Sequence, residues 1–154
     1  MKRLSTVFLG LLFFPLISLA DRQLGIDRHS QYRNKLANLR VALVVNQASL
    51  TSDGQHAIDF LIAKKIRIVK LFALEHGVRG GGEAGEELPD ARDEVTGLPI
   101  VSLYGANRKP TPAMLRDVDV VVYDIQDVGV RFYTYISSLG LIIGMFQGFL
   151  QFCC

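Results

Sequence analysis

The feature that most constrains this chain is a series of short, mostly apolar runs separated by turn-forming or helical segments. These runs lack the alternation of a half-exposed strand and are typical of strands buried on both faces of a parallel sheet. They occupy residues 40–46, 66–73, 98–102 and 118–123.

Two of the connecting segments have helical signals. Ile58, Leu61 and Ile62 recur at helical spacing and predict a helix over about 55–64. Thr111 followed by Pro112 has the form of an N-cap with proline at the first helical position, which predicts a short helix over 112–116. Strands that alternate with helices in this way predict an α/β fold with a parallel sheet.

Polar residues follow three of the predicted strands. They are Asn46, the pair Glu75 and His76, and the segment 124–127 with its two aspartates. Ligands of open parallel sheets bind outside the carboxyl ends of the strands. Any one of these strand ends could be ordinary, but three together predict a polar site at one edge of the sheet.

Glu75 and His76 could be functional or could simply cap a turn. A carboxyl group at a partly buried strand end can serve as a general acid, because desolvation favours its protonated form. His76 could hydrogen-bond to it or act as a second proton carrier. Position alone leaves the catalytic and the structural interpretation equally open.

Asp124 and Asp127 could act as an acid and base pair, or one could pair with Arg131, which is the commoner arrangement. The segment 131–135 combines this arginine with Tyr133, Tyr135 and a hydroxyl. Aromatic rings stack on the apolar face of a sugar and polar groups read its hydroxyls, so the segment suits a sugar pocket. It is equally compatible with an ordinary junction between strand and helix.

Residues 80–85 match the glycine pattern of a dinucleotide-binding loop, but this interpretation is rejected. The true motif opens a helix whose N-terminus holds a diphosphate. Here the chain continues into an acidic segment, 86–90, broken by a proline. A surface loop is expected instead, and with no metal-ligand spacing the chain is expected to need no cofactor or metal.

The first twenty residues predict a secretory signal. Lys2 and Arg3 precede an apolar run of about thirteen residues, short of the roughly twenty that span a membrane, and Ala20 ends a plausible cleavage site. An uncleaved anchor is the weaker alternative. Of 17 basic and 15 acidic residues, cleavage would remove only these two cations and leave 15 of each, so no nucleic-acid partner is expected. Cys153 and Cys154 are adjacent and predict no useful disulfide.

Taken together, the motifs resemble the bacterial exo-β-N-acetylmuramidase family, long catalogued as a domain of unknown function. The resemblance covers about residues 25–140 and is most specific in the last of its motifs. The matching segments are residues 44–47, 75–80, 84–86, 96–99, 102–105, 109–112 and 124–136.

This resemblance implies an exported hydrolase, periplasmic or extracellular, that removes N-acetylmuramic acid from non-reducing ends of peptidoglycan fragments. It implies a Rossmann-like N-terminal catalytic domain, over residues 21–140, with its site in a cleft. Glu75 is expected to be the acid catalyst, with His76 and Asp127 as further catalytic candidates. The residues expected to bind the substrate, a muropeptide or amino sugar, are Asn46, Arg79, Asp124, Arg131, Tyr133 and Tyr135.

Two departures limit these implications. Ala73 and Leu74 stand where the family commonly has Ser-Pro, and family members are more than twice as long as the matched region. Residues 141–154 form an uncharged, apolar tail that leaves the family pattern. It could be a frame-shifted or prematurely ended product, a membrane-attaching helix, or a buried helix. The first two would leave the sheet short of strands at one edge, and membrane contact is expected only through this tail or an uncleaved signal.

Glycoside hydrolysis usually requires two carboxyl groups that flank the bond. The chain offers Glu75 and either Asp124 or Asp127, and the truncated domain is expected to be weakly active or inactive. The alternatives are a non-catalytic fragment that binds muramyl sugars and an inactive membrane-associated remnant.

Overall fold

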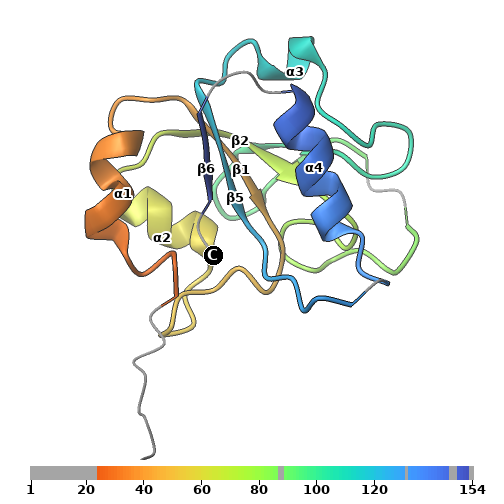
Figure 1. Cartoon of the computed structure of the whole chain (residues 1–154), viewed down its shortest axis with the longest axis horizontal. Helices are drawn as coiled ribbons and strands as arrows, with labels where there is room; N and C mark the ends of the chain where they lie inside the picture. The colour runs from red at the N-terminus through yellow and green to blue at the C-terminus, as the bar shows by residue number, and fades with distance from the viewer. Residues whose placement is uncertain (1–23, 87–88, 131, 146–148, 153–154) are drawn as a thin grey trace, which may run out of the picture.

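The computed structural model describes residues 24–86, 89–130, 132–145 and 149–152. These residues form one six-stranded sheet with helices on both faces (Figure 1), in the strand order β3-β4-β2-β1-β5-β6. The elements are α1 (His29–Leu36), β1 (Val41–Val45), α2 (Ala57–Ala63), β2 (Ile68–Ala73), β3 (Ala91–Arg92), β4 (Pro99–Ser102), α3 (Pro112–Leu115), β5 (Val120–Asp124), α4 (Tyr135–Met145) and β6 (Phe149–Phe152).

The predicted α/β fold with a parallel sheet is confirmed. β1 lies at the centre and pairs in parallel with β2 on one side and β5 on the other. All residues of β1 and β5 are buried, as expected for apolar strands covered on both faces. β4 also pairs in parallel with β2, and only the two-residue β3 is antiparallel.

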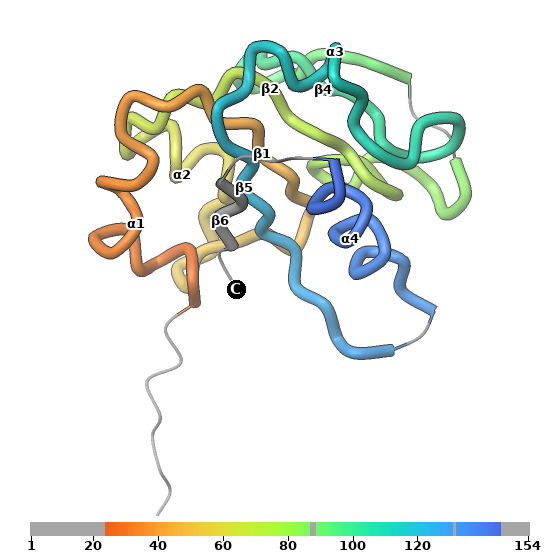
Figure 2. The backbone as a smooth tube through the Cα atoms, turned by 45° about the horizontal axis from the view of Figure 1, so that its top comes forward, coloured from red at the N-terminus to blue at the C-terminus, as the bar shows by residue number. Residues whose placement is uncertain are grey.

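Alternate residues of the central strands feed two separate cores. Val41, Leu43 and Val45 pack with α1 and α2 on one face of the sheet. Ala42 and Val44 pack with α4 and with residues of α3 on the other. Figure 1 shows α1 and α2 on the opposite side of the strands from α4, and Figure 2 shows the connection between β4 and α3 running close to α4.

The two predicted helices are present as α2 and α3, both slightly shorter than expected. His56 caps α2, since its side chain accepts a hydrogen bond from the backbone N–H of Ile58. Thr111 caps α3 and Pro112 is its first residue, as the sequence predicted. The sequence analysis did not predict α1, β3, α4 or β6.

The C-terminal part contributes one face of the core. Tyr135, Leu139 and Ile142 recur at helical spacing along α4 and pack on the sheet, with Ile142 completely buried. α4 crosses the expected boundary at residue 140, and the tail 141–154 contains the end of this helix and the strand β6, so the three interpretations of the tail stay open. β6 pairs in parallel with β5, so β5 is not an edge strand.

No helix among the described residues is long and apolar enough to cross a membrane. The predicted signal sequence and the two cysteines lie outside the described residues, so both remain predictions.

Candidate functional site

The carboxyl ends of the three central strands open onto one cavity. Because β2, β1 and β5 are neighbours and parallel, the segments that follow them lie side by side. Together they line a cavity of about 290 Å³, which we call the edge cavity. Its lining residues are Asn46, Gln47, Ala48, Glu75, His76, Gln126, Val128, Phe132, Tyr133, Thr134 and Tyr135.

Glu75 is held at the wall of the edge cavity by two donors. Its Oε1 accepts hydrogen bonds from the hydroxyl of Tyr104 and from the backbone N–H of Gly85, both at 3.1 Å. The hydroxyl of Tyr135 donates to the backbone carbonyl of Glu75 at 3.4 Å. The carboxyl group is therefore fixed in orientation yet half-buried, as a proton donor to a bound ligand must be.

His76 occupies a strained turn beside Glu75. It has a φ of 70° and is followed by Gly77 with a φ of 76°. A non-glycine residue in this left-handed region costs energy and is concentrated at functional sites. Nδ1 of His76 lies 3.2 Å from the carbonyl oxygen of Gly82. Because a carbonyl can only accept, Nδ1–H of His76 donates to Gly82, and Nε2 is the ring nitrogen that this contact leaves available.

Asn46 belongs both to the cavity and to its supporting wall. The residue is 3% exposed, and its Oδ1 accepts from the backbone N–H of Ala48 at 2.9 Å. The hydroxyl of Ser49 accepts from the backbone N–H of Asn46 at 3.0 Å and contacts the carbonyl of Asp124. The ends of β1 and β5 are thereby tied together beneath the cavity.

His56 extends this support to the segment after β2. Its Nε2 lies 3.1 Å from the carbonyl oxygens of both Asn46 and Val78, so Nε2–H donates between them. Burial is the main cause that lowers the pKa of His56, with the Arg79 charge second. A neutral His56 thus connects two strand ends. The sequence signal available for it was its place just before a helical pattern.

Asp124 ends β5 but does not line the edge cavity. Side chains alternate across a strand, so Asp124 faces the same side of β5 as Val120 and Val122, which pack with α1 and α2. The residue is 9% exposed, and its Oδ2 has no hydrogen-bond partner among the described residues. Burial, followed by the charge of Asp27, raises the pKa of Asp124 to about 6.

Asp127 and Arg131 are not brought to the cavity by any described contact. Asp127 is exposed, and its Oδ1 accepts from the backbone N–H of Gly129 at 2.7 Å, which is a local turn. Arg131 lies outside the described residues. The catalytic role of Asp127 and the binding role of Arg131 therefore stay predictions.

Arg79 is held away from the edge cavity by two carboxylates. Its Nε donates to Asp93 at 2.6 Å, and its two terminal nitrogens reach Asp59 at 2.9 and 3.0 Å. Hydrogen bonds from Arg79 are the largest cause that lowers the pKa of both aspartates. The arrangement joins α2 to the loops around β3, and the sugar contact expected for Arg79 stays a prediction.

Aromatic side chains form the remaining wall. The rings of Tyr133 and Tyr135 meet edge to face at 6.2 Å between centroids, and Tyr133 is 48% exposed. Phe132 is 92% exposed. Exposed rings beside a polar cavity are suited to stacking on the apolar face of a sugar ring.

Tyr104 and several lining residues were not assigned a role from the sequence. Tyr104 follows buried Leu103 at the carboxyl end of β4, so its place at a strand end was the available signal. The loop that matched the dinucleotide pattern contains no helix among its described residues 80–86. No three His, Cys, Asp or Glu side chains gather into a metal-binding group in the part of the chain that the structure describes.

The chain is similar to proteins of one known family. Residues 41–147 match the family model described as "Exo-beta-N-acetylmuramidase NamZ, N-terminal". Over 119 residues the chain is 44% identical to the peptidoglycan beta-N-acetylmuramidase NamZ of Bacillus subtilis strain 168, covering 76% of this chain and 29% of that protein.

Two crystal structures of DUF1343 family proteins from Bacteroides fragilis are also similar. One has a TM-score of 0.68 at 44% identity, over 77% of this chain and 30% of its own. The other has a TM-score of 0.70 at 30% identity, over 85% of this chain and 34% of its own. The chain thus spans about a third of the length of these relatives.

Proposed function

Because this chain matches the N-terminal part of the NamZ exo-β-N-acetylmuramidase family and so belongs to that family, we propose that its edge cavity binds an amino sugar of a peptidoglycan fragment. The observation that carries the proposal is the carboxyl group of Glu75, oriented by Tyr104 and Gly85 in a cavity that also has an aromatic wall. The reaction would be hydrolysis at a non-reducing end, releasing N-acetylmuramic acid.

Glu75 has the role of general acid in this proposal. It would protonate the oxygen of the leaving sugar as the glycosidic bond breaks. His76 directly follows Glu75, and its Nε2 would accept a proton or a hydrogen bond from a sugar hydroxyl. Tyr133 and Tyr135 would stack against the sugar ring.

A second carboxylate is not present among the described lining residues of the edge cavity, where Glu75 is the sole acid. Asp124 belongs to the opposite face of β5, and Asp127 is engaged in its own turn. We therefore propose that this chain alone hydrolyses slowly or not at all. The same observation favours a second candidate function, binding of a muramyl sugar without hydrolysis.

The test measures both activities with the full chain. Free N-acetylmuramic acid released from a disaccharide with that sugar at its non-reducing end reports hydrolysis, and calorimetry with N-acetylmuramic acid reports binding. Glu75→Gln should abolish any hydrolysis and leave the dissociation constant within about threefold, because the amide keeps the shape of the side chain. Glu94→Gln, an exposed position outside the cavity lining, is the matched control.

The outcomes separate the candidates. Hydrolysis by the unmodified chain that Glu75→Gln removes supports the enzyme, and binding without hydrolysis supports the sugar-binding fragment. Hydrolysis that survives Glu75→Gln would refute the assignment of the acid. Absence of binding to any amino sugar by the folded chain would refute both.

Export is part of the proposal and rests on residues 1–20 alone. Expression in a bacterial host followed by fractionation and mass measurement should find a mature chain that begins at Asp21 outside the cytoplasm. An intact chain retained inside the cell would contradict it.

A further inference from the structure

His56 lies outside the lining of the edge cavity, yet its ring contacts two of the segments that follow the central strands. The loop after β1 returns on itself, because Leu50 and His56 form an antiparallel bridge and the backbone N–H of Ala57 donates to the carbonyl of Ser49 at 2.8 Å. This return brings the imidazole back to the end of β1, where Nε2 lies 3.1 Å from the carbonyl oxygen of Asn46. The backbone of this loop therefore fixes where the ring lies.

The hydrogen bonds of the ring determine where its proton lies. A backbone N–H can only donate, so Nδ1 of His56 accepts from Ile58 at 3.3 Å. Carbonyl oxygens can only accept, so Nε2–H donates to Asn46 and Val78, each at 3.1 Å. A second proton, on Nδ1, would point at the N–H of Ile58 and remove the cap of α2. The three contacts are therefore satisfied together only by the neutral imidazole.

The contact with Val78 anchors the turn that begins at Glu75. Between these two residues the chain passes through His76 and Gly77, whose φ values are 70° and 76°. A non-glycine residue persists in this conformation only where the surrounding structure holds it. The carbonyl of Val78, bound by His56, is the far end of the turn. One imidazole thus sets the spacing between the end of β1 and the segment that carries the candidate acid.

The groups around His56 keep its ring neutral at neutral pH. Burial is the largest cause that lowers the pKa of His56, and the guanidinium of Arg79 adds to it. The charge of Asp59 and the two carbonyl contacts act in the opposite direction, and Asp59 is itself paired with Arg79 at 2.9 Å. Because the pKa lies below its ordinary value of 6.5, the ring gains its second proton mainly as the pH falls below that value.

We propose that His56 is a positioning residue for the edge cavity: its neutral imidazole holds Asn46 and the turn at Glu75 at the spacing that a ligand requires, and protonation of the ring releases that spacing. The inference rests on the proposed function in taking an amino sugar as the ligand. His56 acts through Asn46 and Val78, because it does not line the cavity itself.

Two substitutions separate the two nitrogens of the ring. His56→Gln places an amide nitrogen near the position of Nε2, so it can still donate to both carbonyls, and it does not titrate. His56→Asn keeps an oxygen near the position of Nδ1 and is a favoured N-cap residue, but its amide is too short to reach the carbonyls. His29→Gln is the matched control, because His29 is also a half-buried histidine, packed against Tyr32 and Phe60 and absent from the cavity lining.

Calorimetry with the full chain measures the affinity for N-acetylmuramic acid from about pH 7.5 to about pH 5, where the sugar's own carboxyl group stays ionised because such groups titrate near about pH 3.5. The unmodified chain should lose about tenfold in affinity across this range, since the protonated ring must move away from Ile58 and from the carbonyls. His56→Gln should bind within about threefold of the unmodified chain at the upper end of the range and show no such pH dependence. His56→Asn should bind about tenfold more weakly throughout, and His29→Gln should match the unmodified chain.

Three outcomes would overturn the inference while leaving the proposed function in place. One is an affinity of His56→Asn equal to that of the unmodified chain. Another is a pH dependence that persists in His56→Gln. The third is a pH dependence that disappears in Asp124→Asn, because Asp124, with a pKa of about 6, titrates in the same range.

NMR spectra of the free chain separate this inference from a failure of the proposed function. A Cβ on Gly80 would lie 2.9 Å from Cβ of Gln47, so a nuclear Overhauser effect between these residues reports the spacing of the two segments without any sugar. The effect should weaken as the ring nitrogens of His56 titrate, and it should stay constant in His56→Gln. If no amino sugar binds, this result still supports the positioning role, and an effect that stays constant while the ring titrates overturns it.

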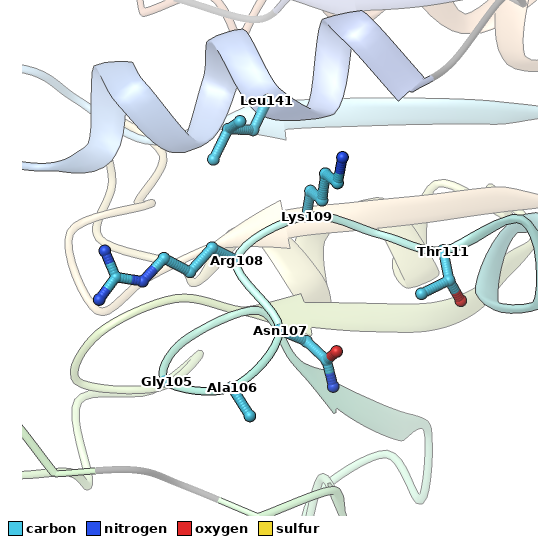
Figure 3. Close-up of a pocket in the computed structure, with 7 residues that line it drawn as sticks. All are labelled: Gly105, Ala106, Asn107, Arg108, Lys109, Thr111 and Leu141. Atoms are coloured by element: carbon cyan, nitrogen blue, oxygen red, sulfur yellow. The ribbon is translucent and has the colours of Figure 1, made fainter.

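A second cavity, of about 480 Å³, provides the internal control. It lies between the loop after β4 and Leu141 of α4 (Figure 3), and none of the hydrogen bonds that His56 forms with described residues reaches its lining. Amide signals of Gly105 and Asn107 in this loop should not follow the titration of His56. If they change together with the contact between Gly80 and Gln47, acid loosens the chain as a whole and the inference is overturned.

Discussion

Two polar groups follow the same strand, and they differ in how far their hydrogen-bonding capacity is used. Glu75 comes two residues after β2, at the wall of a cavity, and holds its carboxyl with two neutral donors. Arg79 comes four residues later and is saturated by Asp59 and Asp93. A charged group whose partners are all internal stabilises the fold, whereas one that faces a cavity with spare capacity can serve a ligand. The following variants test that contrast, beginning with the largest expected effect.

Arg79→Met should destabilise the fold by about 3 kcal/mol, because Asp93 is 3% exposed in its side chain and would remain buried without its cation. Urea denaturation measures the change in the free energy of unfolding. Glu75→Gln in the same assay should change it by less than about 1 kcal/mol. If Arg79→Met has the unfolding free energy of the unmodified chain but no longer binds sugar, the structural role assigned to Arg79 is contradicted.

Asp124 should make stability fall as the pH rises. Its pKa of about 6 in the fold lies above the ordinary value of 3.8, so the fold favours the protonated form. The stabilisation is complete below about pH 4 and is lost as the pH passes through 6, and this pKa difference corresponds to at most about 3 kcal/mol. Denaturation of Asp124→Asn and the unmodified chain from pH 4 to 7.5 should show a gap in unfolding free energy that shifts in favour of the variant with rising pH.

The Arg79 group should respond to pH in the opposite direction. Arg79 lowers the pKa of Asp59 and Asp93, so the stability that these ion pairs contribute is lost as the pH falls through the lowered pKa values.

For Asp124, a constant difference in unfolding free energy between Asp124→Asn and the unmodified chain at every pH would contradict the assignment.

Gly80→Ala tests the loop that begins directly after Arg79 and returns to the edge cavity. Gly80 has a φ of 80°, and an added Cβ would come within 2.9 Å of Cβ of Gln47 in the edge cavity. We expect a cost of about 2 kcal/mol and displaced amide signals around Gln47. Gly54→Ala is the control, since Gly54 has a φ of 84° with nothing within 4 Å, and should cost about 1 kcal/mol. Equal costs would show that the contact with Gln47 is unimportant.

Tyr104→Phe should have the smallest effect. It removes one hydrogen bond to Glu75 and should lower the free energy of unfolding by about 0.5–1 kcal/mol. Tyr133→Phe provides the comparison, because no hydrogen bond of its hydroxyl occurs among the described residues, and it should leave stability unchanged. A larger loss for Tyr133→Phe would reverse the assignment of these two tyrosines.

Much of the sheet was predictable because buried strands need continuous apolar residues. The runs that became β1, β2, β4 and β5 were recognisable for that reason. α4 was missed because its segment is apolar on all sides, with Ile136 and Ile143 exposed and Ile142 buried, so the helical period does not stand out. α1 was missed for the opposite reason, because its residues are mostly polar and only Tyr32 and Leu36 are buried.

The candidate site was predictable in its location and only partly in its membership. Glu75, His76, Asn46, Tyr133 and Tyr135 do line one cavity, as residues at neighbouring strand ends must. Asp124 lies outside the cavity lining because side chains alternate across a strand. The last residue of β5 therefore faces the same side as Val120 and Val122, which pack with α1 and α2. Arg79 also lies outside the cavity lining, because it pairs with Asp59 of α2 and with Asp93 in the loop after β3. No local sequence pattern connects Arg79 to these two aspartates.

The sequence by itself determined the alternation of strands and helices, the two capped helices and the strand ends at which polar residues gather. These follow from local hydrophobic pattern and backbone preference, which need only neighbouring residues. The tertiary structure decided which of those polar groups are satisfied internally and which are left facing a cavity. That distinction depends on contacts between residues far apart in the chain, such as Glu75 with Tyr104 and Arg79 with Asp59.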